Sequence, residues 1–184
     1  MAFLTLILLL AGGDLFVVDA SAQATYNVSL SREQLRTYVD DIGLFARNMP
    51  GVVAVKPLTD STYLYQTEKD IPLSGAMKTD FVIHKTVVGD SVTTYLSRDS
   101  GDPNFMSCRV ILRTFDATTT TIEIKLRVRL SRENASEVHW LAPVLGEEFI
   151  SRQMTKDMDD MLQEFIKNSN EELYDHAQQA SVSR

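Results

Sequence analysis

Three histidines are the first residues to consider for chemistry, and none has a partner at metal-ligand spacing. His84 shares one side of a predicted strand with Asp80, so the two could form a polar pair inside a cavity. The opposite side carries the more apolar set, beginning with Phe81, and we therefore expect His84 to face solvent. His139 is expected at the rim of the closing helix, and His176 in a flexible tail. No metal site is predicted.

Carboxylates in the C-terminal segment resemble the paired acids of some enzymes, but most of them fall off the apolar side of that segment. A solvated helix face accounts for them. They are Glu147, Glu148, Asp157, Asp159, Asp160 and Glu164. Gly-rich phosphate loops, serine nucleophile motifs and Cys/His zinc patterns are absent from the sequence, and the single cysteine, Cys108, is expected to lie in a sheet. We predict no catalytic residue and no cofactor.

The element that must position any site is a long amphipathic helix, predicted from Pro143 to Tyr174. Its apolar residues recur at helical spacing and cover one face, which indicates a helix lying on a core. They are Ile150, Met154, Met158, Met161, Leu162 and Phe165. Methionine is flexible and fills irregular space, so this face suits a cavity wall as well as a solid core.

The chain before this helix predicts one strand, two short helices and then successive strands. Thr25 to Leu30 alternates as a half-buried strand, and Ser31 with Gln34 forms a capping-box pattern at a helix start. Pro50-Gly51 ends the second short helix. The later strands are predicted at Val52 to Pro57, Thr62 to Thr67, Lys78 to Val88, Val92 to Ser97, Met106 to Phe115 and Thr118 to Leu130.

The last of these strands predicts a sheet with one dry face. Its apolar residues from Ile122 to Leu130 alternate strictly with charged residues such as Glu123 and Arg127. Only the long helix is large enough to cover that face. The expected fold is therefore α+β, with a curved antiparallel sheet of about seven strands wrapped around the C-terminal helix, and an apolar cavity is expected between them.

This order of elements resembles the START-like, or SRPBCC, superfamily with its helix-grip fold. The resemblance covers about residues 25–172 and rests on the turn Asn48-Met49-Pro50-Gly51-Val52, on the hairpin series, and on Leu145-Gly146 before the long helix. It is strongest for two branches, the polyketide cyclase/lipid-transport proteins and the G-subunit-like proteins of carbon monoxide dehydrogenase. The resemblance implies binding of a lipid or another hydrophobic molecule, and in a minority of members catalysis.

The cavity is expected to be lined by apolar residues of the central strands and the long helix, with tyrosine hydroxyls orienting a ligand. The predicted ligand-binding residues are Tyr63, Tyr65, Met77, Phe81, Ile83, Tyr95, Met106, Cys108, Trp140, Phe149, Met154, Met158 and Met161. Ordinary core packing is the other interpretation of each of them.

The composition and the N-terminal segment limit the possible partners and the cellular location of the protein. A length of 184 residues suits one domain. The net charge of −7 argues against nucleic acid as a partner. Residues 1–24 combine an apolar run, Phe3 to Leu10, with small residues ending at Ala24, which is typical of a secretory signal peptide. We expect export to the periplasm or outside the cell, with a cytoplasmic location as the alternative. The domain would then span residues 25–174, followed by a flexible tail, 175–184, and no stable membrane span is expected.

Two alternatives apply to that N-terminal segment: an upstream mis-start, or an extra apolar strand covering the sheet. For function, the leading hypothesis is a binder or carrier of a hydrophobic small molecule or lipid without catalysis. A cyclase or dehydratase acting in the same cavity is the alternative, and it requires Asp80, His84 or Tyr65 to point inward. A third hypothesis is a protein-interaction scaffold whose core is filled. The oligomeric state is left open.

Overall fold

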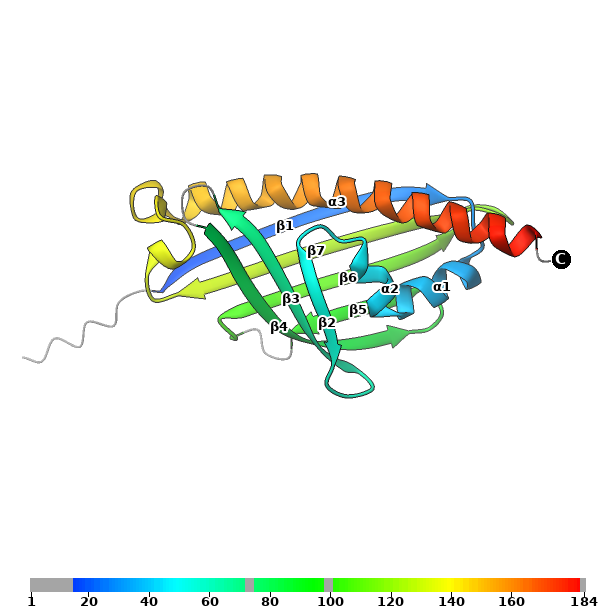
Figure 1. Ribbon diagram of the computed structural model, residues 1–184, viewed down its shortest axis with the longest axis horizontal. Coiled ribbons are helices and arrows are strands. Elements are labelled where there is room, and N and C mark those ends of the chain that lie inside the picture. The colour runs from blue at the N-terminus through cyan, green and yellow to red at the C-terminus, as the bar shows by residue number, and fades with distance from the viewer. Residues whose placement is uncertain (1–14, 72–74, 98–100, 183–184) are drawn as a thin grey trace, which may run out of the picture.

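A computed structural model describes residues 15–71, 75–97 and 101–182. Seven strands form a single antiparallel sheet in the order β1-β7-β6-β5-β4-β3-β2. Its strands are β1 Phe16–Val28, β2 Val52–Pro57, β3 Thr62–Ile71, β4 Gly75–Val88, β5 Val92–Ser97, β6 Asn104–Thr114 and β7 Thr120–Arg132. The strands β2 to β4 cross the direction of β1, β7 and β6 steeply, so the sheet is strongly curved (Figure 1). The predicted α+β helix-grip architecture is confirmed.

Two short helices, α1 (Arg32–Asp40) and α2 (Ile42–Arg47), follow β1 at one end of the sheet. The predicted capping box is present, because Ser31 accepts from the Gln34 backbone and the Gln34 side chain accepts from the Ser31 backbone. Asp41 caps the second helix through Oδ1, which accepts from the amides of Gly43 and Leu44 at 2.9 and 3.1 Å. Local capping thus fixes the sharp turn between the two helices.

The first strand begins at Phe16, nine residues before its predicted start at Thr25. Nine residues of the expected signal peptide, 16–24, pair with β7. Val18, Ala20, Ala22 and Ala24 are buried on the inner face, beneath the long helix. The small residues that resemble a cleavage site therefore have a packing role, since they let the helix lie close to β1. The apolar run from Phe3 to Leu10 lies outside the described residues.

The long helix, α3 (Ala142–Val182), lies along β1 over the concave side of the sheet (Figure 1). Gly146 has φ 79° and ψ 166°, so the regular helix begins after it rather than at Pro143. Helical backbone continues to Val182, and the predicted end at Tyr174 is wrong. A single-turn 3-10 helix, η1 (Ala135–Glu137), precedes α3.

Side chains of α3 bind backbone amides of β1, which is an edge strand of the sheet. The amide of Val17 donates to Glu147 Oε1 at 2.6 Å, and the amide of Asp19 donates to Ser151 Oγ at 3.2 Å. An edge strand otherwise exposes such donors to pairing with other chains. These contacts fix the helix along one border of the sheet and leave its methionine side directed over the curved centre.

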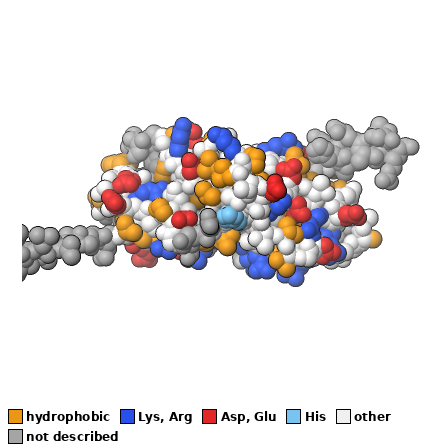
Figure 2. All heavy atoms as spheres, turned by 90° about the horizontal axis from the view of Figure 1, so that it is seen from below, with side chains coloured by type: hydrophobic (Ala, Val, Ile, Leu, Met, Phe, Trp, Pro, Cys, Tyr) orange, Lys and Arg blue, Asp and Glu red, His pale blue; other side chains and the backbone are white. Residues whose placement is uncertain are grey.

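The outer face of the sheet is exposed and mixed in character. In the view of Figure 2, hydrophobic side chains gather near the middle among acidic and basic ones. Val82 and Leu96 are exposed residues of this outer face. No helix among the described residues is long and apolar enough to cross a membrane.

Candidate ligand-binding cavity

A cavity of about 810 Å³ lies between α3 and the concave face of the sheet. Its volume falls within the range of about 300–1,000 Å³ usual for small-molecule sites. Eleven of the thirteen predicted ligand-binding residues line it: Tyr65, Met77, Phe81, Ile83, Tyr95, Met106, Cys108, Phe149, Met154, Met158 and Met161. The scaffold hypothesis requires a solidly packed core, and the structure has a cavity instead.

Methionine is concentrated on this cavity. All six methionines after Met1 line it, and they come from four different elements or turns. They are Met49, Met77, Met106, Met154, Met158 and Met161. A surface made of flexible thioether chains can adapt to ligands of different shape, which a wall of branched residues does less well.

Two predicted ligand-binding residues lie elsewhere. Tyr63 borders a separate depression of about 410 Å³ near the α1–α2 turn, and its hydroxyl donates to Asp60 O at 3.2 Å. Trp140 is 47% exposed and stacks on His139, with ring centroids 6.2 Å apart. Tyr63 shares its strand face with Tyr65 but lies past the end of the cavity. Residue spacing gives the face of a strand but not how far a cavity extends along it.

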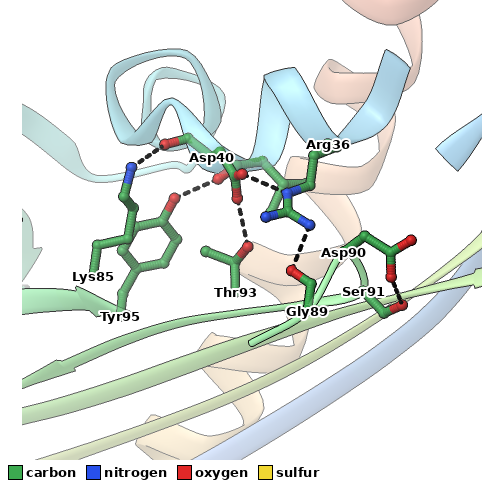
Figure 3. Close-up of polar contacts among 9 residues, drawn as sticks. Arg36, Asp40, Lys85, Gly89, Asp90, Ser91, Thr93 and Tyr95 are labelled. Carbon is green, nitrogen blue, oxygen red and sulfur yellow. Dashed lines mark hydrogen bonds and ion pairs between the residues drawn. The ribbon is translucent and has the colours of Figure 1, made fainter. Parts of the chain in front are cut away.

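Tyr95 lines the cavity with its ring, while its hydroxyl is committed to the protein. That hydroxyl donates to the carbonyl of Val39, at the end of α1 (Figure 3). Around it, Asp40 accepts from Thr93 Oγ1 at 2.6 Å and pairs with Arg36, and Lys85 Nζ donates to the Asp40 carbonyl at 3.0 Å. This network ties α1 to β4 and β5. Burial raises the pKa of Tyr95, and the nearby Cys108 adds to the shift.

Tyr65 is the tyrosine whose hydroxyl is available to a ligand. It is 7% exposed, lines the cavity, and makes no hydrogen bond to any described residue. Its ring is tilted against Phe81 at a centroid distance of 6.5 Å. Burial raises the pKa of Tyr65, and Cys108 contributes. The hydroxyl is therefore protonated at neutral pH and can donate to a ligand acceptor.

Thr79 adds a second polar group to the same wall. It is buried, lines the cavity, and its hydroxyl also lacks a hydrogen-bond partner among the residues described. Thr79 is opposite Thr67 in the β3–β4 register, and Tyr65 is opposite Phe81, so Tyr65 and Thr79 are diagonal neighbours on one face. Diagonal cross-strand neighbours lie about 7–8 Å apart at Cα, which sets two hydroxyl groups within reach of one ligand.

The other two candidates for inward-facing chemistry belong to the outer face. Asp80 is exposed and accepts from Gln66 Nε2 at 3.0 Å. His84 is half-buried, and its Nδ1 bonds Thr62 Oγ1 at 2.9 Å. Neither residue lines the cavity. Of the three titratable residues that a cyclase mechanism could use, only Tyr65 faces the interior.

Charged residues surround the opening of the cavity, which is a feature that the sequence pattern did not predict. Asp157, Asp160 and Glu164 of α3 line it, and Asp160 and Glu164 are also exposed, as the predicted solvated face requires. Across the opening, Lys69 of β3 forms an ion pair with Asp157. Their spacing of three and four residues places these acids on one stripe beside the methionines, and that spacing was the signal available in the sequence.

Further lining residues come from segments that were not predicted to reach the cavity. Gly51, with φ +80°, forms the turn after α2, and its carbonyl accepts from the Glu68 amide at 2.8 Å. Leu126, Val128 and Leu130 line the cavity from β7. The strict alternation of β7 already predicts these three residues on the dry face. How far the cavity extends toward β7 could not be predicted.

Cys108 is buried in the wall, where burial raises its pKa to about 12. A thiol with such a pKa is protonated at neutral pH and is a poor nucleophile. His139 lies at the rim, as expected, and its Nδ1 accepts from the Leu141 amide at 3.0 Å. Among the described residues, no group of three or more His, Cys, Asp or Glu side chains could hold a metal ion.

Comparison with known proteins gives likeness of structure without likeness of sequence. No protein-family model matches the chain, and no curated protein does. A START superfamily protein from Mycobacterium smegmatis superposes with a TM-score of 0.60 at 14% identity, covering 84% of this chain and 97% of that one. A conserved protein from Geobacillus kaustophilus gives a TM-score of 0.61 at 12% identity, covering 84% and 95%.

The Zhui aromatase/cyclase from Streptomyces sp. R1128 is also similar, with a TM-score of 0.55 at 12% identity over 82% of this chain and 94% of that chain. Identities this low speak for the fold alone. What the chain shares with these proteins is therefore its architecture, a curved antiparallel sheet with a long helix over its concave face. The chain has the START-like, or SRPBCC, helix-grip fold.

Proposed function

We propose that this protein binds or carries a hydrophobic small molecule or lipid in the cavity between α3 and the sheet, without catalysing a reaction. The observation that carries the proposal is the 810 Å³ cavity and its methionine lining. An apolar cavity of this size favours an occupant, because removing apolar surface from water contributes about 25 cal/mol per Å².

The hydroxyl groups of Tyr65 and Thr79 give the ligand an orientation. Both residues are buried, and neither hydroxyl is satisfied by a described protein group. A hydrogen bond from such a hydroxyl to a ligand acceptor contributes about 0.5–1.5 kcal/mol net. The preferred ligand therefore has a mainly apolar body and can carry one or two hydrogen-bonding groups.

Native mass spectrometry of the purified protein, followed by solvent extraction, tests for a co-purified ligand. Binding of the neutral fluorescent probe N-phenyl-1-naphthylamine gives a second readout. Met161→Trp, which fills part of the cavity, is expected to weaken probe binding at least tenfold. Ile166→Trp is the matched control, because Ile166 is half-buried on the same helix and does not line the cavity. Equal binding by both variants, each folded by circular dichroism, would contradict the proposal.

A second candidate is a cyclase-type enzyme, and Tyr65 is the observation that favours it. One structural relative is described as an aromatase/cyclase, and here a protonated tyrosine hydroxyl faces the cavity. Such a hydroxyl could donate a hydrogen bond to a substrate carbonyl during ring closure. Incubation with a linear poly-β-ketone analogue tests this: ring formation that falls in Tyr65→Phe while probe binding persists supports it. No faster ring formation than in buffer excludes it.

A further inference from the structure

The opening of the cavity carries a strong excess of negative charge. Five carboxylates and one ammonium group line the cavity at this end. The acids are Glu68, Asp70, Asp157, Asp160 and Glu164, and the cation is Lys69. The apolar interior and the acidic rim together suit an amphiphile, a molecule with an apolar body and a polar head group.

Two of the five carboxylates are already neutralised by partners. Asp157 pairs with Lys69 across the opening, and Glu68 lies 3.4 Å from Lys78. The other three, Asp70, Asp160 and Glu164, form no ion pair with any residue that the structure describes. Asp160 and Glu164 are exposed and lie one turn apart on α3, so they face the same space.

We propose that the cavity selects amphiphiles with a cationic head group, of the long-chain primary amine class, over anionic ones such as fatty acids. The apolar chain occupies the methionine-lined interior, and the ammonium group lies at the rim near Asp160, Glu164 and Asp70. A second, independent observation is the buried Tyr65, which lines the same cavity and whose hydroxyl has no described protein partner, so the wall also offers a polar group to a ligand. This inference rests on the proposed binding function.

The size of the preference follows from Coulomb's law. In water, one unpaired carboxylate roughly 8 Å from an ammonium group favours binding by about twofold, and three together by about tenfold. The same three groups disfavour a carboxylate head by a similar factor. At about 10 mM ionic strength the Debye length is about 30 Å, so little of this is screened, while at about 1 M it falls to about 3 Å and the preference is lost.

Three probes with the same chain length isolate the head group: dodecylamine, dodecanol and dodecanoate, each kept below micelle-forming concentration at pH 7. Displacement of N-phenyl-1-naphthylamine at low salt measures their affinities. We expect the amine to bind about tenfold more tightly than the alcohol, and the alcohol more tightly than the carboxylate. In 1 M salt the three affinities should converge.

The double variant Asp160→Asn/Glu164→Gln is expected to reduce the preference for amine over alcohol to about threefold or less. The control Asp159→Asn/Glu171→Gln makes the same change in net charge on exposed α3 residues that do not line the cavity, and should keep the preference. Dodecanoate binding as tightly as dodecylamine, or an unchanged preference in the rim variant, would overturn the inference. If the neutral probe and dodecanol also fail to bind, the proposed function itself is wrong.

Discussion

Three tyrosines of strands β3 and β5 show how the surroundings of a side chain decide its role. Tyr63 donates to Asp60, Tyr95 donates to Val39, and Tyr65 has no partner among the described residues. The first two hydroxyls are used for folding. Only the third is left for a ligand, although the strand pattern in the sequence treats all three alike.

Replacing Tyr95 and Tyr65 by phenylalanine, one at a time, separates the folding role from the ligand-binding role. Tyr95→Phe leaves the Val39 carbonyl without its donor, and we expect it to lower the free energy of unfolding by about 1–2 kcal/mol. Tyr65→Phe removes a hydroxyl that has no protein partner, so stability should change by less than about 0.5 kcal/mol or rise slightly. Urea unfolding measures both. The assignment fails if Tyr65→Phe proves the more destabilising of the two.

Cys108 predicts how stability depends on alkaline pH. Burial raises its pKa from 9.0 to about 12, so the folded state holds the proton more tightly than the unfolded chain does. Its contribution is complete below pH 9 and is lost as pH rises from 9 to about 12. Between about pH 8 and pH 10 this one group accounts for a loss on the order of 1 kcal/mol. Cys108→Ala should remove that part of the decline, which urea unfolding at the two pH values measures.

The residues of the cavity could be predicted largely because burial and cavity lining use the same pattern. Phe81, Ile83 and Met106 follow the period of two that places a side chain on the dry face. The exposed position of Trp140, outside the cavity, could not be predicted. This residue lies in the connection before α3, where no periodic pattern indicates which way a side chain points. The acidic rim was missed because Asp160 and Glu164 are polar, and polarity on a helix ordinarily means solvent.

The helix α3 joins two functions along its length. Near its beginning, Glu147 and Ser151 bind the amides of β1, and further along Met154, Met158 and Met161 line the cavity. Toward its C-terminal half, Ser169 is fully buried and its hydroxyl lies 3.0 Å from that of Tyr38 in α1. Hydrogen bonds therefore hold α3 on both sides of the segment that lines the cavity.

The strand β1 gives a prediction for the N-terminus. Deleting residues 1–24 removes nine of the thirteen paired positions of β1 together with the buried Val18 and three alanines. We expect that protein to unfold or aggregate, because the inner face of β7 and the underside of α3 would be exposed. Deleting residues 1–14 leaves β1 complete and should leave the melting temperature within a few degrees of the full chain.

Circular dichroism and thermal melting of the two truncated proteins make this comparison. A protein lacking residues 1–24 that melts like the full chain would contradict the role of β1. Export stays a prediction, and this strand constrains it: cleavage after Ala24 would cut within β1. Order and type of the elements were predictable from period and capping, whereas the boundary at Phe16 was not, because alternating small residues fit both a strand and a cleavage site.

At the scale of the whole molecule, the space under α3 is divided into a solid part and a hollow part. Leu162 and Phe165 are fully buried and do not line the cavity, and Phe165 packs on Phe45 at a ring distance of 5.0 Å. Met158, one turn before Leu162, is almost as buried but borders the cavity. The sequence could not show this division, since both residues lie on the same apolar stripe.

Two substitutions on this stripe measure the division directly. Leu162→Ala creates a void inside close-packed structure and should cost about 3–4 kcal/mol, because the removed atoms lose contacts on every side. Met158→Ala enlarges a space that already exists, so fewer contacts are lost and we expect a cost of about 1–2 kcal/mol. Urea unfolding of both variants, without added ligand and after removal of any co-purified one, gives the comparison.

With a saturating hydrophobic ligand, the difference between the two losses in the free energy of unfolding should shrink or change sign. Met158→Ala then also loses contacts to the ligand, whereas Leu162→Ala keeps them. Equal costs without ligand would mean that the cavity wall is packed as tightly as the core, and the case for an occupant would fail with it.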